Sequence, residues 1–202
     1  MLQNNNRSAR YIQDPMGYRH SKEEILEGAI SFAFEEGLSR LTFGALGRHL
    51  GISDRIIVYY FPSKDALVGE VLDAIGLRLQ TTLGMVVGSS LPDHKALVEA
   101  VWPVVARKKS DPVFALFFEA SGLAAAGVEP YRSMAAALVK GWIGWAEQLI
   151  GGSPEHRKIE AAAAIAILDG LLLMRQLAGP DAAERAVRGI VSSGSISRPR
   201  KK

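Results

Sequence analysis

Apolar residues recur along most of this chain at intervals of three and four, the spacing of helices that bury one face. The first such segment begins at Ser21, which together with Glu24 forms the capping box of a helix start. Its apolar residues, from Ile25 to Ala33, lie on one side, and Gly37 ends it. No run of alternating apolar and polar residues lies between hairpin turns. The pattern therefore predicts an all-α protein.

Later helices are predicted from the residues that open them. Proline suits the first turn of a helix, and Ser, Asp or Thr just before it can cap the N–H groups. On these signals, helices begin at Pro62, Pro92 or Asp93, Asp111, Glu129, Ser153 and Pro180. The two ends of the chain lack any period. Residues 1–19 are predicted to be a flexible arm, and residues 192–202 a flexible basic tail that is solvated or binds phosphate.

Two short helices joined by a tight turn are predicted between residues 42 and 61. Thr42 can cap the first helix, and Gly51 ends it. Ser53 can cap the second helix, and Pro62 prevents it from continuing. The side chains expected to face inward are Leu46, Leu50, Ile57 and Phe61. This outline is that of a helix-turn-helix, although a helical hairpin that only packs gives the same signals.

The outer face of the second short helix carries residue types suited to a DNA groove. Arg55, Ile56 and Tyr59 are predicted to face outward, with Tyr60 at the edge. Arginine binds guanine edges or phosphate, tyrosine hydroxyls bind phosphate, and an apolar side chain contacts a thymine methyl group. Backbone N–H groups at helix starts also attract phosphate. The candidate DNA-binding residues are Thr42, Arg48, Ser53, Arg55, Ile56, Tyr59, Tyr60 and Lys64.

The segment from Leu41 to Leu67, above all its stretch Tyr-Tyr-Phe-Pro-Ser-Lys-Asp-Ala-Leu, closely resembles the DNA-binding head of TetR-type (tetracycline-repressor-like) transcriptional regulators. The resemblance covers about residues 20–70. It implies an all-α homodimer that binds a palindromic operator and responds to a small molecule. It also implies a three-helix helix-turn-helix head at residues 20–66 and a larger helical ligand-binding and dimerisation body at residues 67–191. By the same resemblance, Thr42 and Lys64 would contact phosphate, and Tyr59 and Tyr60 would contact DNA.

Three positions in the predicted recognition helix depart from this family pattern. Family members usually carry a small residue at Arg55, a Thr or Ser at Ile56 and a Tyr at Val58. The arginine adds a hydrogen-bond donor, and the two apolar residues remove hydroxyls. In addition, residues 20–70 contain more acidic than basic side chains. Two interpretations follow: the head reads an altered operator, or it no longer reads DNA and the chain is a helical interaction protein.

The remaining helices hold candidates for a ligand site. Large aromatic residues could line a pocket for a flat, apolar molecule, although such stripes also build ordinary cores. Charged residues inside apolar helices must be paired, exposed or used. Asp169 and Arg175 are six positions apart, so we expect each to find its partner elsewhere, across a dimer. The candidate ligand-binding residues are Trp102, Phe118, Glu119, Trp142, Trp145, Asp169 and Arg175.

Composition excludes several classes of site. The 202 residues include no cysteine, which excludes disulfides, zinc–thiolate sites, iron–sulfur clusters and a thiol nucleophile. The four histidines show no metal-ligand spacing, and no phosphate loop or nucleophile elbow is present. An all-α enzyme would have to rely on Glu119 or Asp169. We therefore expect no catalytic residue, metal or cofactor. No secretory signal or clean membrane span is visible, so we expect a soluble, cytoplasmic protein. Together with the resemblance to TetR-type regulators, this makes a repressor controlled by an effector the predicted function.

Overall fold

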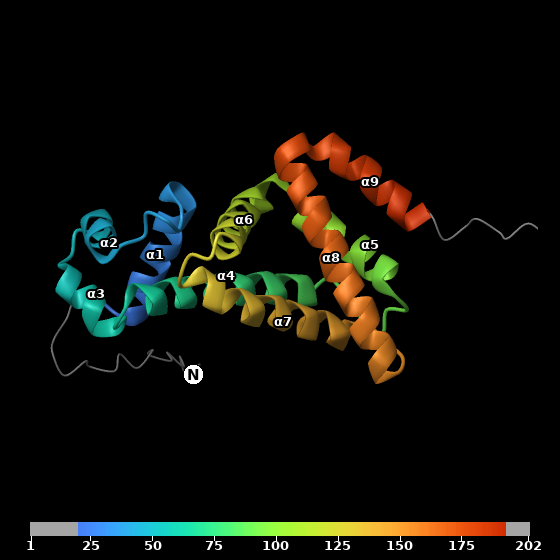
Figure 1. Cartoon of the computed structure of the whole chain (residues 1–202), viewed down its shortest axis with the longest axis horizontal. Helices are drawn as coiled ribbons and strands as arrows, with labels where there is room; N and C mark the ends of the chain where they lie inside the picture. Colours follow the sequence, from blue (N-terminus) through green and yellow to red (C-terminus); the bar gives the residue numbers. More distant parts are fainter. Residues whose placement is uncertain (1–19, 193–202) are drawn as a thin grey trace, which may run out of the picture.

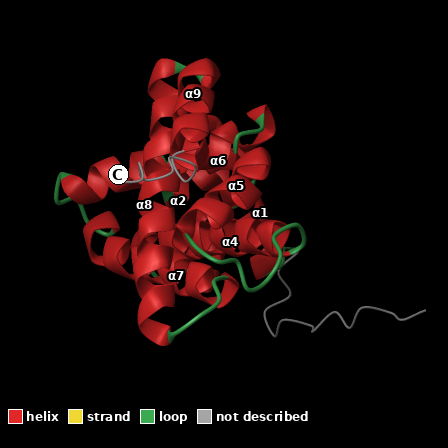
Figure 2. Ribbon diagram, turned by 90° about the vertical axis from the view of Figure 1, so that its right-hand side faces the viewer, coloured by secondary structure: helices red, strands yellow, loops and turns green. Residues whose placement is uncertain are grey.

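The computed structural model describes residues 20–192; the predicted arm at residues 1–19 and nearly all of the predicted tail lie outside this range. The described part is helical throughout apart from its loops and one isolated bridge, as the sequence predicts (Figures 1 and 2). The helices are α1 (Lys22–Glu36), α2 (Phe43–Leu50), α3 (Asp54–Tyr60), α4 (Lys64–Gly84), α5 (His94–Val105), the 3₁₀ turn η1 (Lys108–Ser110), α6 (Asp111–Ala125), α7 (Tyr131–Leu149), α8 (Pro154–Ala178) and α9 (Pro180–Ser192).

The predicted caps form as expected. Ser21 and Glu24 make both hydrogen bonds of the capping box at the start of α1, at 3.1 and 3.0 Å. The Thr42 hydroxyl accepts a hydrogen bond from the N–H of Ala45, and Asp93 does the same for Ala96. These side chains satisfy donors that the first helical turn leaves free, so α1, α2 and α5 begin where the sequence places their caps. The expectation that Asp111 caps α6 is wrong, because Asp111 is the first helical residue and no side chain caps this helix. Helix α4 begins at Lys64 rather than at Pro62.

The molecule is elongated, with the small helices at one end and α5, α8 and α9 at the other (Figure 1). Helices α4, α6 and α7 lie between these ends. Two hydrophobic cores correspond to this arrangement. We call the first the head core; it joins buried side chains of α1–α4 to Leu116, Ala120 and Tyr131 from later in the chain. The second, the body core, joins buried side chains of α5, α8 and α9 to the end of α4 and parts of α6 and α7.

Among the described helices, α8 alone is long and apolar enough to cross a membrane, judged by length and composition only. A third of its most apolar stretch is buried within the protein. It packs against α5, α6, α7 and α9, which places it in the body core. One side of it nevertheless remains uncovered. The exposed positions, which we call the α8 stripe, are Ile159, Ala162, Ala166, Gly170, Leu173 and Leu177.

Candidate DNA interface and ligand cavity

The turn between α2 and α3 is held by a close backbone approach at Gly47. The N–H of Ile52 donates a hydrogen bond to the carbonyl oxygen of Gly47 at 2.9 Å. A Cβ atom at position 47 would lie only 2.9 Å from the carbonyl oxygen of Ile52. Gly51, in the left-handed region with φ of 66°, then reverses the chain. The crossing of the two short helices therefore depends on glycine at both positions.

The interior of this helix pair is as predicted. Leu46, Ile57 and Phe61 are fully buried in the head core, and Leu50 packs against it. Because Ile57 and Phe61 are four positions apart, they fix which side of α3 faces the solvent. The outer side of the helix follows from this register.

The outer face of α3 carries Arg55, Val58 and Tyr59, all exposed. The prediction that Ile56 faces outward is wrong, since this side chain is half-buried and packs against the head core. Val58, which was not among the candidates, takes the outward place with 45% of its surface exposed. The spacing is consistent with this result, because positions 55, 58 and 59 share one helix face, while position 56 shares the opposite face with the half-buried position 60.

Tyr60 has a structural partner. Its hydroxyl donates a hydrogen bond to the carbonyl oxygen of His20 at 3.0 Å, and its ring meets that of Tyr59 edge to face. The hydroxyl proton therefore ties α3 to the start of α1, and a structural role accounts for Tyr60; its contact with DNA stays a prediction. Tyr59 stays outward with 47% of its surface exposed.

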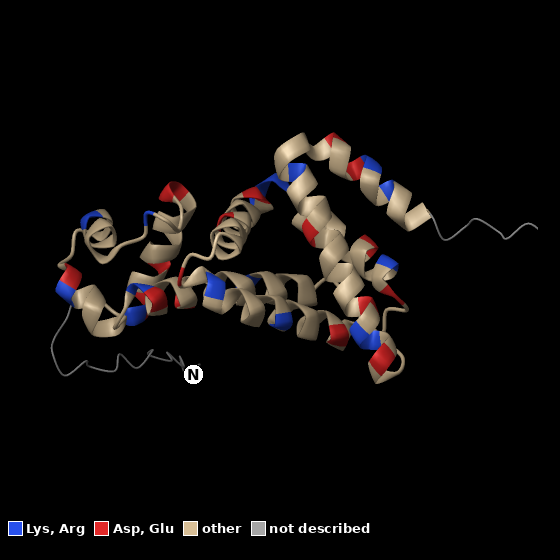
Figure 3. Ribbon diagram, viewed as in Figure 1, with Lys and Arg blue, Asp and Glu red and all other residues tan. Residues whose placement is uncertain are grey.

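The candidate phosphate-binding residues surround this face. Thr42 and Ser53 both cap helices through their side-chain oxygens, and each leaves the N-terminal N–H groups of its helix at the surface. Arg48 is exposed on α2, and Lys64 is half-exposed at the start of α4. Acidic and basic positions are interspersed at this end of the molecule (Figure 3). The positive charge available to DNA is therefore confined to individual side chains of α2 and α3 and does not form a broad basic surface.

Glu119 of α6 joins the body to the head. Its two carboxylate oxygens accept hydrogen bonds from the N–H groups of Leu38 and Ser39, both at 2.9 Å. Burial would raise the pKa of Glu119, but these two N–H groups and the Ser39 side chain hold it below its ordinary value. Gly37, with φ of 88°, leaves room for the carboxylate, because a Cβ there would lie 3.0 Å from it. We call this contact the Glu119 clamp.

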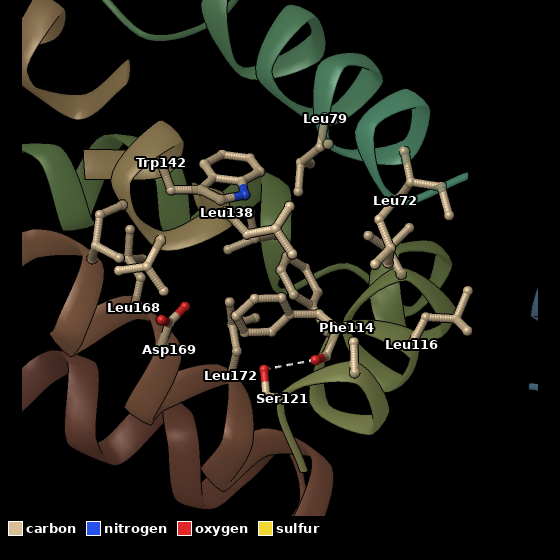
Figure 4. Close-up of a pocket in the computed structure, with 18 of the residues that line it drawn as sticks. Leu72, Leu79, Phe114, Leu116, Ser121, Leu138, Trp142, Leu168, Asp169 and Leu172 are labelled. Carbon is tan, nitrogen blue, oxygen red and sulfur yellow. Dashed lines mark hydrogen bonds between the residues drawn. The ribbon is translucent and has the colours of Figure 1, made fainter. Parts of the chain in front are cut away.

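A cavity of about 130 Å³ lies between α4, α5, α6, α7 and α8 (Figure 4). Its wall is largely apolar and draws on both cores, from Leu72 and Leu116 on the head side to Leu168 and Leu172 on the body side. Trp142 and Trp145 contribute indole rings from α7, with centroids 5.6 Å apart. Polar groups in the wall are few. Those of its side chains are the two indole N–H groups, Ser121, Tyr131 and Asp169.

Three of the seven candidate ligand-binding residues line this cavity: Trp142, Trp145 and Asp169. The other four do not. Trp102 donates its indole N–H to Glu184 of α9 at 2.8 Å, and Phe118 packs on the body core. Glu119 forms the clamp described above. We therefore remove Trp102, Phe118 and Glu119 from the candidate set.

Arg175 is also removed, because it has a partner within its own chain. Its guanidinium donates to both carboxylate oxygens of Asp111, at 2.9 and 3.3 Å, and only 9% of the arginine side chain is exposed. The prediction that this charge finds its partner across a dimer is wrong. The ion pair instead fixes the start of α6 against the end of α8.

Asp169 differs from these residues in having no such partner. Within residues 20–192 no hydrogen bond or ion pair is formed by its carboxylate, which extends from α8 into the space facing α6 and α7 (Figure 4). Burial raises its pKa to about 6. Tyr131 resembles it, since its hydroxyl is buried without a hydrogen-bond partner in the described part of the chain. In the same range, no cluster of His, Asp or Glu has the arrangement of a metal site.

Comparisons with known proteins agree with this geometry. Residues 25–71 match the family model described as bacterial regulatory proteins, tetR family. The fold is similar to that of a TetR transcriptional regulator from Legionella pneumophila, at 19% identity and a TM-score of 0.62, covering 87% of this chain and 97% of that one. It is also similar to the multidrug binding protein EbrR complexed with imidazole, at 18% identity and a TM-score of 0.62 over the full length of both chains.

A third similar structure is GusR of Salmonella enterica, with 18% identity, a TM-score of 0.55 and coverage of 83% of this chain and 93% of that one. No curated protein sequence matches the chain. The family model matches the head alone, and the α-helical fold of the described residues is the one shared with these solved structures. Residues 25–71 of this chain therefore match the tetR family model, and its described residues share the fold of solved TetR regulators.

Proposed function

We propose that this chain is a cytoplasmic repressor that binds a palindromic operator as a homodimer and changes its affinity when a small, largely apolar effector enters the cavity. One observation carries the proposal: α6 lines the cavity on one side and holds the head through the Glu119 clamp on another. A ligand that moves α6 thereby acts on the head directly. The division into a head at residues 20–66 and a body at residues 67–191 belongs to the same proposal.

The α8 stripe supports the dimer. Its positions recur every three or four residues, so they form one continuous apolar face along the helix. Its middle is made of Ala162, Ala166 and Gly170, whose small side chains let a second helix approach closely. Leu177 at its end is 80% exposed, and Ile159 at the other end is 59% exposed. A second copy of the same face, related by a two-fold axis, would cover all of it.

Placing a charge in the middle of this face is expected to separate the dimer. Ala166→Glu would bury two carboxylates against apolar surface near the two-fold axis, at a cost of several kcal/mol. We expect sedimentation analysis to show a monomer and operator affinity to fall at least about 100-fold. The exposed residue Lys158 lies on the same helix outside the stripe, so Lys158→Glu is the control and should remain dimeric. A dimeric Ala166→Glu protein would contradict this assignment of the interface.

Contacts with DNA are proposed for two sets of residues. Arg55, Val58 and Tyr59 on the outer face of α3 would enter the major groove and read base edges. The second set would bind phosphate on either side of the groove and comprises Thr42, Arg48, Ser53 and Lys64. Ile56 and Tyr60 would support α3 from within. Two heads related by the dimer axis would then read half-sites about one helical turn apart, or a multiple of that.

Selection of bound fragments from a random duplex library, followed by a salt titration, tests this proposal. We expect a palindrome whose affinity falls steeply as salt rises, because phosphate contacts release counterions. Arg55→Ala should weaken binding to that site about 10-fold or more and relax the preference at one base pair of each half-site. Lys140→Ala, an exposed cation on α7, is the control and should leave selection unchanged.

A second function is favoured by the composition of the α3 face. Val58 replaces a hydroxyl donor with an apolar group, and Asp54 places a carboxylate in the first turn of the same helix. A helical interaction protein with a head that does not read DNA would carry such a face. It predicts no enriched sequence even at low salt, with or without an added ligand. Enrichment of any palindrome decides for a DNA-binding regulator over the interaction protein.

The effector and the operator are coupled in both directions. A ligand that binds one head spacing better than the other must weaken or strengthen operator binding by the factor by which the operator changes ligand affinity. The solved relative EbrR is a multidrug binding protein with imidazole bound. That description supports a small-molecule role for the cavity of this chain.

A further inference from the structure

The cavity contains a carboxylate whose position serves no structural purpose within the described chain. Other acidic residues near the body core have partners: Asp111 binds Arg175, Glu160 binds the N–H of His94, and Glu184 binds Trp102. Asp169 has none in residues 20–192, although it lies in an apolar helix and lines an apolar wall. Burial without a partner is costly for a charged group. The cavity at Asp169 therefore lacks a counter-charge that a ligand could supply.

The charges around Asp169 confirm that none of the packed elements supplies one. Among the described residues that line the cavity from α4, α5, α6 and α7, the one other titratable side chain is Tyr131. Burial raises the pKa of the Tyr131 hydroxyl, and the negative charges of Glu119 and Asp65 raise it further, so it stays neutral. Arg175, the nearest cation along α8, is occupied by Asp111 of α6.

The volume and the apolar lining of the cavity indicate the size and character of the uncharged part of the ligand. The volume of about 130 Å³ is close to that of engineered apolar cavities of about 150 Å³ that hold one benzene ring. Trp142 and Trp145 offer aromatic faces, which attract a cation as well as a flat ring. The buried Tyr131 hydroxyl offers a hydrogen bond that no described protein group accepts. A single-ring body with one positive group fits this wall.

We propose that the effector cavity selects a small lipophilic cation, a protonated amine carried on an aromatic or alicyclic ring, with the Asp169 carboxylate as its counter-ion. The proposal rests on the proposed function, because it names the chemical class of effector for the same cavity. The amine donates hydrogen bonds to the carboxylate while the ring replaces empty space between α6 and α7. The carboxylate is partly buried in an apolar wall, where charge-assisted hydrogen bonds are stronger than in bulk water and discriminate between charged and neutral ligands.

Benzylamine, benzyl alcohol and benzoate test the proposal, because they share a ring and differ in charge. Binding to the purified full-length protein is measured by calorimetry without DNA. Benzylamine is expected to bind at least 10-fold more tightly than benzyl alcohol, and benzoate is expected not to bind. Equal binding of the amine and the alcohol, tighter binding of benzoate, or no saturable binding of benzylamine would each overturn the proposal.

The wild-type pH profile gives a second measurement that needs no variant. Since burial places the pKa of Asp169 at about 6, benzylamine affinity should fall below that pH by up to about 10-fold per unit. The affinity of benzyl alcohol should not change over the same range. A flat profile for benzylamine would overturn the proposal.

Two variants test whether the Asp169 carboxylate is the counter-ion. Asp169→Asn should bring the affinities for benzylamine and benzyl alcohol within about 2-fold of each other and flatten the pH profile. It should also raise the midpoint of thermal unfolding, because the ionised carboxylate destabilises the folded chain above pH 6 or so. Asp73→Asn is the control, since it removes an exposed carboxylate of α4 that does not line the cavity, and it should keep the preference for the amine. Retention of that preference by Asp169→Asn would overturn the proposal.

The ligand-binding experiments can fail or succeed independently of the operator selection that tests the proposed function. If benzylamine binds with the expected preference but no palindrome is selected, the cavity assignment stands and the repressor is wrong. If a palindrome is selected and benzylamine fails to bind, the repressor stands and the effector is not a small cation. Release of the selected duplex by benzylamine from the wild type, but not from Asp169→Asn, would show that ligand binding at Asp169 controls DNA binding.

Discussion

Gly47→Val is expected to disable the head. A Cβ atom at this position would meet the carbonyl oxygen of Ile52 at 2.9 Å, and a backbone oxygen cannot turn aside as a side chain can. Valine adds two further methyl groups at the same place, so α3 must move relative to α2. We expect the free energy of unfolding to fall by about 3 kcal/mol and operator affinity to fall at least about 100-fold. Chemical denaturation and a duplex-binding titration measure the two effects.

Gly44→Val, one turn earlier in α2, is the matched control. Its position is exposed, and the nearest atom to a Cβ there is the mobile end of Arg48, at 3.7 Å. Because glycine is a poor helix former, this variant should keep wild-type stability or gain a few tenths of a kcal/mol. Equal stability of the two valine variants would show that the α2–α3 crossing tolerates displacement. That result would contradict the dependence of the crossing on the close approach at Gly47.

Glu119→Ala is expected to loosen the head from the body. It removes both acceptors of the clamp and leaves the N–H groups of Leu38 and Ser39 without their partner. A hydrogen bond to a charged group contributes about 1.5–3 kcal/mol. Because the exposed N–H of Ser39 can bind water in place of the carboxylate, we expect the free energy of unfolding to fall by about 3 kcal/mol rather than by twice that contribution. Hydrogen exchange of the Leu38 and Ser39 amides should accelerate by more than 10-fold. The N–H of Ala45, which Thr42 caps, reports whether the head itself has unfolded.

The same contact has a pH dependence of defined sign. The pKa of Glu119 is lower in the folded chain than its ordinary value, so its stabilising effect is complete above that ordinary value. The effect is lost as pH falls through the lowered pKa. Glu119→Ala should therefore remove part of the acid sensitivity of the wild type. Glu99→Ala, an exposed acidic residue on α5, is the control, and an identical acid sensitivity in the wild type and Glu119→Ala would contradict the clamp.

Local signals in the sequence predicted the elements of this fold well. Ser21, Thr42 and Asp93 cap helices in the structure because a cap and its target are three residues apart. The register of α3 was less secure. In a helix of seven residues, both sides of the buried Ile57 are within reach of the core, and packing assigns Ile56 to the inside and Val58 to the outside.

The roles of the charged residues in the body could not be predicted, because their partners are distant in sequence. Glu119 binds a residue 81 positions away, and Arg175 binds one 64 positions away. Trp102 reaches across 82 positions to α9. A sequence identifies such residues as unusual in an apolar helix but does not name the partner. Asp169 was identified by the same criterion, and it is the one whose partner is missing from the described chain.

The composition of the head core limits how parts of this chain can be exchanged with those of proteins of similar fold. Leu116, Ala120 and Tyr131 belong to that core although they follow α5 in the chain, and the Glu119 clamp comes from the same stretch. A hybrid made by transplanting residues 20–84 onto a foreign body would expose the apolar surface that these side chains cover. The exchangeable unit is therefore discontinuous: it consists of the first four helices together with α6 and the beginning of α7.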